Sequence, residues 1–264
     1  MNEGMFGFPS GEKIDFIETE YDSDSTHVLA RNCKAVFIEM CGGGGGGGNG
    51  TVNGNGGSGG CGGMYWSGWI TPNEFGSNAT VDIGAGGAAG VNGSDTILTN
   101  AATSKIFARV SGGRANSRDS FNYNGVTTSS GFGAGGVFNG GQGRHGGNGP
   151  GGGGGGHNGS SSGATGGRPC SFLMIGPTTW TADGGGGATG IFNANGNNGT
   201  VRIRGFGEGA AGGGRNATTL EAFNGGNGAA GGGGGGGGGA STSNAGTGGS
   251  GGNGYVRIME VCYV

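Results

Sequence analysis

Three uninterrupted glycine runs constrain the fold of this chain more than any other feature. Runs of seven, six and nine glycines occupy residues 42–48, 151–156 and 231–239. Such a run is either a flexible linker or an ordered helix of the polyproline-II type, which has three residues per turn and no internal hydrogen bonds. In the ordered form the N–H and C=O groups point outward and can bond to neighbouring runs, and only glycine lets backbones approach closely on every side.

The energetics decide when such a run is ordered. Fixing a backbone costs about 1–2 kcal/mol per residue, whereas a hydrogen bond returns a net ~0.5–1.5 kcal/mol. An isolated run therefore stays disordered, but a bundle in which nearly every group is bonded can form if apolar strands stabilise it. Because the glycine blocks alternate with ordinary segments along the whole chain, we expect an ordered polyglycine-II bundle; a mostly loose chain is the alternative.

Composition excludes several classes of protein. Glycine makes up 80 of the 264 residues, only 11% are charged, and the formal net charge is -3. Collagen is excluded because it needs glycine at every third position and abundant proline. No basic patch indicates nucleic-acid binding, and no apolar stretch is long enough for membrane insertion.

Two segments at opposite ends of the chain have strong strand signals. Residues 33–41 and 255–264 are rich in β-branched and apolar residues, and each adjoins a glycine block. We expect these two strands to pair and to close the domain. Residues 93–115 and 167–188 each read as strand, turn, strand and glycine run, and residues 200–204 alternate with the period of a strand.

The predicted fold class is therefore mostly irregular and β. It is a polyglycine-II helix bundle closed by short β-strands and hairpins, with almost no α-helix, since leucine is scarce. We divide the chain into an N-terminal lead, residues 1–13, and one glycine-rich domain, residues 14–264.

The sequence contains matches to two enzyme motifs, but neither match has the neighbouring elements that the motif requires. Residues 56–60 and 248–252 match G-x-S-x-G, but a nucleophile elbow needs a strand-to-helix turn and triad partners. The run 42–48 follows a strand, as in a dinucleotide-binding fingerprint, but no helix follows it. The histidines are scattered and no C-x-x-C is present, so we expect no enzyme activity, no cofactor and no metal. The five cysteines are expected to be reduced and to serve as small hydrophobic residues: Cys33, Cys41, Cys61, Cys170 and Cys262.

The order of the elements resembles a known family. Residues 24–41 form a short strand region that runs directly into polyglycine, residues 80–90 read as a strand followed by Gly-x-Gly-Gly, and residues 252–260 resemble a closing strand. Over residues 14–264 this order resembles the glycine-rich domain of bacteriophage tail-fibre and tail-tip proteins. It is also similar, more broadly, to the tail-tip adhesins of T-even-type phages, although the chain has no counterpart of their fibre-attachment domain.

The resemblance implies a virion protein of the phage tail. It implies a polyglycine-II scaffold whose loops bind a bacterial surface receptor, either a glycan or an outer-membrane protein. Other phage tail proteins are implied partners, and a homotrimer is the assembly common in such fibres. The alternatives are a purely structural tail-tip or connector protein without receptor contact and, on a different basis, an ice-binding protein, which would need a flat face of small residues.

Aromatic residues between the glycine runs are the candidate binding residues, because tyrosine and tryptophan offer large, rigid contact areas with polar groups. The densest cluster lies in residues 64–70, which we expect to form a loop. The competing interpretation is that the same aromatics form a small hydrophobic core. The candidates are Tyr65, Trp66, Trp69, Phe121, Tyr123 and Trp180.

Overall fold

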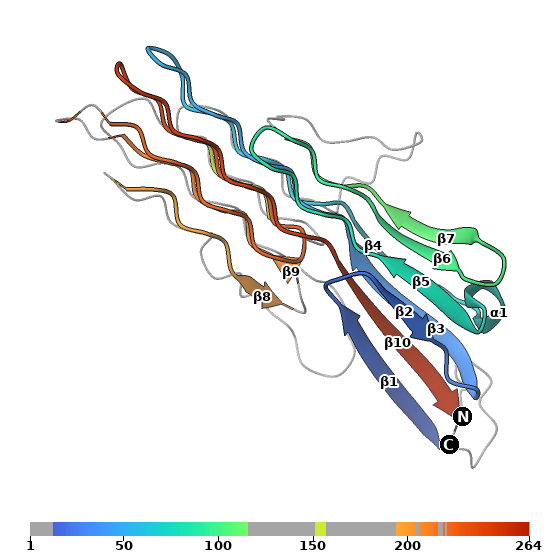
Figure 1. Ribbon diagram of the computed structural model, residues 1–264. Helices are drawn as coiled ribbons and strands as arrows, with labels where there is room; N and C mark the ends of the chain where they lie inside the picture. Colours follow the sequence, from blue (N-terminus) through green and yellow to red (C-terminus); the bar gives the residue numbers. More distant parts are fainter. Residues whose placement is uncertain are drawn as a thin grey trace.

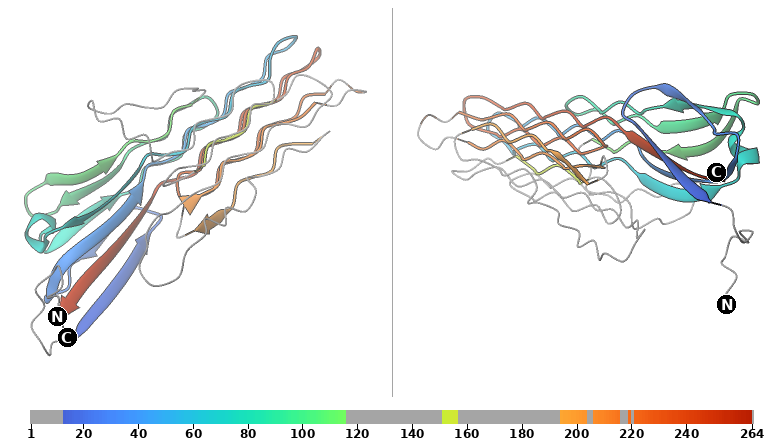
Figure 2. Two further views of the ribbon diagram at one scale, coloured as in Figure 1. Left: turned by 180° about the vertical axis from the view of Figure 1, so that it is seen from behind. Right: turned by 90° about the horizontal axis from the view of Figure 1, so that it is seen from below.

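The computed structural model describes residues 13–115, 151–156, 194–203, 206–215, 219 and 221–263. They form an elongated molecule with two parts (Figure 1). Two antiparallel sheets lie at one end, and a bundle of glycine-rich segments extends from them to the other end, as two further views also show (Figure 2). The predicted N-terminal lead, residues 1–13, lies almost entirely outside the described residues.

The first sheet joins the two ends of the chain. Its strand order is β1 (Ile14–Tyr21), β10 (Tyr255–Tyr263), β3 (Cys33–Cys41) and β4 (Tyr65–Ile70), and all neighbours are antiparallel. The expected pairing of residues 33–41 with residues 255–264 is confirmed, with Ile258 opposite Ile38. Long-range pairing of β3 and β10 therefore closes the domain.

The second sheet joins one early strand to three later strands that follow one another along the chain. Its order is β2 (Ser25–Val28), β5 (Asn78–Asp82), β6 (Thr96–Asn100) and β7 (Lys105–Val110). The hairpin predicted within residues 93–115 is confirmed as β6 and β7, while its predicted counterpart at 167–188 lies outside the described residues. The single helix in the described part of the chain, α1 (Pro72–Phe75), has four residues and begins with a capping box between Thr71 and Glu74.

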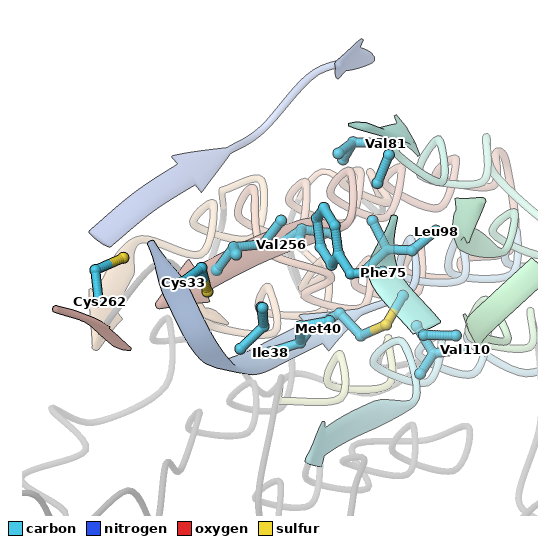
Figure 3. Packing of buried hydrophobic residues seen from close by; sticks show 13 residues of the cluster. Cys33, Ile38, Met40, Phe75, Val81, Leu98, Val110, Val256 and Cys262 are labelled. Atoms are coloured by element: carbon cyan, nitrogen blue, oxygen red, sulfur yellow. The ribbon is translucent and has the colours of Figure 1, made fainter. Parts of the chain in front are cut away.

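The core lies between the two sheets. Along β3, Val36, Ile38 and Met40 alternate with Phe37 and Glu39, so these three side chains share one face of the sheet. That face packs with the second sheet and with Phe75 of α1 (Figure 3). The buried cluster comprises Cys33, Val36, Ile38, Met40, Phe75, Ala79, Val81, Leu98, Ala108, Val110, Val256, Ile258 and Cys262.

The glycine-rich segments form the expected polyglycine-II bundle. In the run 42–48, successive N–H groups point to three different neighbours, and every third residue returns to the same neighbour. These bonds measure 2.7–3.0 Å, with Gly43 and Gly46 donating to Ser94 and Val91, Gly44 and Gly47 to Gly252 and Gly249, and Gly45 and Gly48 to Cys61 and Ser58. The period of three is that of a polyproline-II-type helix.

The carbonyl groups of the same run bond to further segments. They accept from Gly87 and Gly90, from Gly113, and from Gly235 and Gly238. The run is therefore surrounded, and a Cβ added to Gly46 or Gly47 would overlap the backbone of Ala88 or Gly236. The absence of side chains from the run follows from this packing.

Asparagine side chains complete the bonding in the outer segments. The side-chain carbonyls of Asn224 and Asn227 accept the N–H groups of Thr247 and Ser250 at 2.9 and 3.0 Å. In the segment 223–230, residues 224, 227 and 230 are exposed, as a three-residue period requires. The amide group thus replaces a backbone neighbour at the surface.

A small two-stranded sheet, β8 (Val201–Ile203) and β9 (Phe206–Gly207), lies beside the bundle. It confirms the strand expected at residues 200–204. Together the elements are mostly β and irregular, with almost no helix among the described residues. Within that same set, no helix has the length and apolar character needed to cross a membrane.

Candidate functional site

The predicted binding loop at residues 64–70 is instead the edge strand β4, so the expectation of a loop is wrong. Six residues of β4 pair in register with β3, from Tyr65 opposite Cys41 to Ile70 opposite Val36. The stretch forms a strand because its side chains alternate between the two faces of the sheet with a period of two residues. Tyr65 and Trp69 point to one face and Trp66 to the other. Aromatic residues also favour strands, because they pack well on a pleated surface.

The three aromatic side chains of β4 have different surroundings. Trp66 is partly buried and packs against the core between the sheets. Tyr65 packs edge-on against Phe206, with 5.3 Å between ring centroids. Trp69 is 48% exposed and leans against Phe37, so it alone of the three offers a large area to a partner.

A buried charge network lies beside Tyr65. Its hydroxyl donates to Glu39 at 2.9 Å, and Glu39 is fully buried. Arg257 donates to Glu39 at 2.6 Å and to both carboxylate oxygens of Glu18 at 2.5 and 2.7 Å. Burial opposes the guanidinium charge, but these hydrogen bonds hold the pKa of Arg257 above its ordinary value, and burial raises the pKa of Tyr65. Arg257 bonds to both carboxylates, and the network links all four strands of the first sheet.

The other aromatic candidates, Phe121, Tyr123 and Trp180, lie outside the described residues. The glycine bundle offers a different candidate, because several of its chain reversals lie together at the end far from the sheets (Figures 1 and 2). They are the turns at residues 51–55 and 240–245 and a third place where the chain turns back, at which Arg215 and Ala222 form an antiparallel bridge.

The turn at 51–55 is held by its own hydrogen bonds. Thr51 donates its N–H to the carbonyl of Asn55 at 3.0 Å, and Gly54 donates to the carbonyl of Thr51 at 3.1 Å. Asn53 has a φ of 55°, in the left-handed region that asparagine tolerates better than most residues. The side chain of Val52 is 52% exposed at the same turn.

Hydrogen bonds join the three reversals into one surface. Asn53 donates its N–H to the carbonyl of Ser241 at 2.8 Å. Asn244 accepts the N–H of Ala222 with its side-chain carbonyl, also at 2.8 Å. We call a set of exposed residues with side chains at these reversals the tip surface, and it comprises Thr51, Val52, Asn53, Asn55, Glu221, Thr242, Ser243 and Asn244.

A hollow with a volume of about 300 Å³ adjoins the tip surface. This volume is at the lower end of the range for small-molecule pockets. Amide, hydroxyl and peptide groups line the hollow, and none of the described residues in its lining has a charged or aromatic side chain. Such a lining can exchange hydrogen bonds with a polar, uncharged ligand. The lining residues are Gly48, Asn49, Thr51, Asn55, Gly56, Gly57 and Ser58.

The sequence-based prediction rested on aromatic residues, and the tip surface has none among its described residues. A usable signal is present: short polar stretches, 51–55 and 240–244, follow directly on the glycine blocks at 42–50 and 231–239. In a bundle of straight segments, such stretches must form the reversals.

Comparison with known families agrees with this architecture. Residues 19–259 match the glycine-rich domain. The chain belongs to that family. The match spans both sheets and the bundle, so the sheets and the glycine segments are parts of one family domain. No curated protein matches the chain.

Proposed function

We propose that this chain is a bacteriophage tail-fibre or tail-tip protein whose tip surface binds a receptor on the bacterial surface. One observation carries the proposal: reversals from separate glycine segments converge at the end of the bundle opposite to β1 and β10. An adhesin needs this separation between the end that is held and the end that binds. The resemblance to phage tail proteins supplies the biological setting.

The construction of the bundle supports an adhesive role. Each central segment is hydrogen-bonded on all sides, so the reversals project from a support with few soft degrees of freedom. A pre-organised binding surface loses less entropy on binding than a flexible one. Recognition residues commonly lie on loops that a rigid scaffold positions.

The chemistry of the tip favours a surface glycan as the receptor. Its exposed side chains are mainly amides and hydroxyls, which donate to and accept from sugar hydroxyl groups. Such contacts are individually weak in water. Several copies in one fibre, such as a homotrimer, would raise the overall affinity by engaging several sugars at once.

A structural role without receptor contact is the second candidate, and one observation favours it. Phe16 is 59% and Trp69 48% exposed, and both lie on the face of the first sheet that carries Phe37 and Val261. Exposed apolar residues on one face are typical of contacts between proteins. In this alternative, that face docks onto another tail protein and the tip has no ligand.

Binding of the purified, labelled chain to a panel of bacterial strains tests the proposal. We expect V52E/T242E, which adds two charges at the tip, to weaken binding to the responsive strain about tenfold or more, equivalent to ~1.4 kcal/mol. The matched control A85E/A88E adds the same charges at exposed positions on the side of the bundle and should bind normally. Periodate treatment of the cells should remove binding if the receptor is a glycan, and protease treatment if it is a protein.

The alternative gives the opposite result. If W69A abolishes incorporation into phage particles while V52E/T242E adsorbs to cells like the wild type, the chain is a connector and the adhesive role is wrong. Equal melting temperatures for the variants ensure that the comparison concerns surfaces and not folding.

A further inference from the structure

Three potential metal ligands converge where the first long strand begins and the last strand ends. Cys33 opens β3, and Glu260 and Cys262 lie near the end of β10. One ligand atom from each of these residues lies within 4.8 Å of the other two. The register shift between Val261 and Cys262 places Cys262 directly opposite Cys33. Both cysteines lie at one end of the buried cluster (Figure 3).

The carboxylate in this group is unusual because it is buried and, among the residues that the structure describes, has no Lys or Arg partner. Glu260 is 2% exposed, and its Oε1 lies 3.0 Å from Nε2 of His27. The hydroxyl of Tyr21 lies 2.9 Å from Nδ1 of the same ring and can donate to it. With the Tyr21 hydroxyl as donor to Nδ1, the ring is a neutral imidazole whose Nε2–H donates to Glu260. A buried carboxylate that lacks a neighbouring cation is costly.

We propose that Cys33, Cys262 and Glu260 bind a zinc ion. Two thiolates and one carboxylate are ligands that Zn²⁺ accepts, and a water molecule would complete a tetrahedral set. On binding, each thiol S–H bond is replaced by an S–Zn bond and the two protons pass to solvent, with no oxidation or reduction. The ion would also offset the charge of Glu260.

The surroundings of Glu260 suit a ligand that must hold its orientation. One oxygen accepts from His27, and the other accepts the N–H of Ala30 at 2.7 Å. Hydrogen bonds of this kind orient the ligands of metal sites and tune their basicity. Each oxygen has a second lone pair with which it can coordinate an ion.

The consequence would be a tie between the two strands that close the domain. Residues 33 and 262 are nearly the whole chain apart, and a shared ion would hold β3 against β10 at their outer end. Because the unfolded chain cannot assemble this site, bound zinc stabilises the folded state by mass action.

Titration of the purified full-length chain with Zn²⁺ or Co²⁺ under reducing conditions tests the site. We expect one equivalent to bind, with thiolate-to-cobalt charge-transfer absorption and a higher melting temperature. C33S and C262S should lose the absorption and the thermal shift. C61S is the matched control, because Cys61 is also a buried thiol but lies in the glycine bundle.

X-ray absorption at the zinc edge identifies the ligands in the wild-type protein. This measurement therefore does not depend on whether the cysteine variants fold. The wild type should show two sulfur ligands at about 2.3 Å and oxygen ligands near ~2.0–2.2 Å. Three results would overturn the proposal: no metal bound while the thiols are free, a Cys33–Cys262 disulfide in protein purified without reductant, or bound metal with no sulfur ligand.

Discussion

The sheets and the glycine bundle satisfy the same backbone groups in different ways. A strand in the sheets has at most two hydrogen-bonded neighbours and carries side chains on both faces, so the sheets are stabilised largely by burying Val36, Ile38 and similar residues. A central bundle segment such as 42–48 bonds to neighbours all around it and has no side chains to bury. Its stability must come from hydrogen bonds and close backbone contacts.

This contrast predicts different responses to mutation. In the sheets, the loss in the free energy of unfolding should depend on the side-chain volume that a substitution removes from the core. In the bundle, cost should depend on whether any volume is added at all, because the neighbouring atoms are backbone and cannot rotate away. Variants of the two regions can test this difference directly.

The largest effect is expected for an added side chain inside the bundle. Gly46→Val places carbon atoms on the backbone of Ala88, which is itself part of the lattice. We expect a loss of about 3 kcal/mol or more in the free energy of unfolding, at or beyond the top of the usual range for overpacking, measured by urea denaturation. Ala85→Val is the control, since Ala85 is exposed on a neighbouring segment. Equal stability of the two variants would contradict the close packing.

The next effect concerns the core between the sheets. Ile38→Ala should lower the free energy of unfolding by about 2–5 kcal/mol, because the side chain is fully buried and leaves a cavity. Val28→Ala, at a position 68% exposed, should change it by less than ~0.5 kcal/mol. Amide hydrogen exchange would show whether the loss stays in the sheets or also loosens the bundle, which determines whether the two parts unfold together.

A smaller effect is expected where Tyr65 meets the charge network. Tyr65→Phe removes the hydroxyl that donates to fully buried Glu39, and should cost about 1–3 kcal/mol. Trp69→Phe, on the same face of β4, keeps an exposed aromatic ring and serves as the control in thermal denaturation. If Tyr65→Phe leaves the melting temperature unchanged, the network does not depend on this donor.

The smallest effect is expected at the surface of the bundle. Asn227→Ala removes the carbonyl that accepts the N–H of Ser250, and should cost about 0.5–1.5 kcal/mol. Asn227→Asp keeps an acceptor in the same place and should retain most of the stability. If both substitutions have the same cost, the asparagines do not act as substitutes for backbone neighbours.

Much of the fold could be predicted from the sequence. Residues 33–41 and 255–263 are rich in apolar and β-branched residues, which predicts strands, and the place of these strands at opposite ends of the glycine-rich chain predicts their pairing. The bundle followed from the fact that only glycine permits close backbone contact on all sides. The hairpin of β6 and β7 followed from local strand and turn signals.

Other parts could not be read so directly. Residues 64–70 were interpreted as a loop because three aromatics in a short stretch indicated a binding surface, whereas their two-residue alternation marks a strand. The helix α1 is too short for a periodic pattern, and a sequence signal for it is the Thr-x-x-Glu capping box at residues 71–74. The group of Cys33, Glu260 and Cys262 depends on the register of two distant strands, including a bulge, which no local pattern specifies.

The screw symmetry of the bundle has a consequence for how such a chain can change in length. In a three-residue screw, deleting one glycine from an all-glycine stretch slides the rest forward onto equivalent places, so the lattice is restored and only the reversal is drawn inward. The same deletion in 223–230 would rotate Asn224 and Asn227 from the exterior toward the interior. All-glycine inner segments can therefore lose or gain single residues. Outer segments such as 223–230 can change length only by three residues at a time, because only then do their asparagines stay on the exposed face.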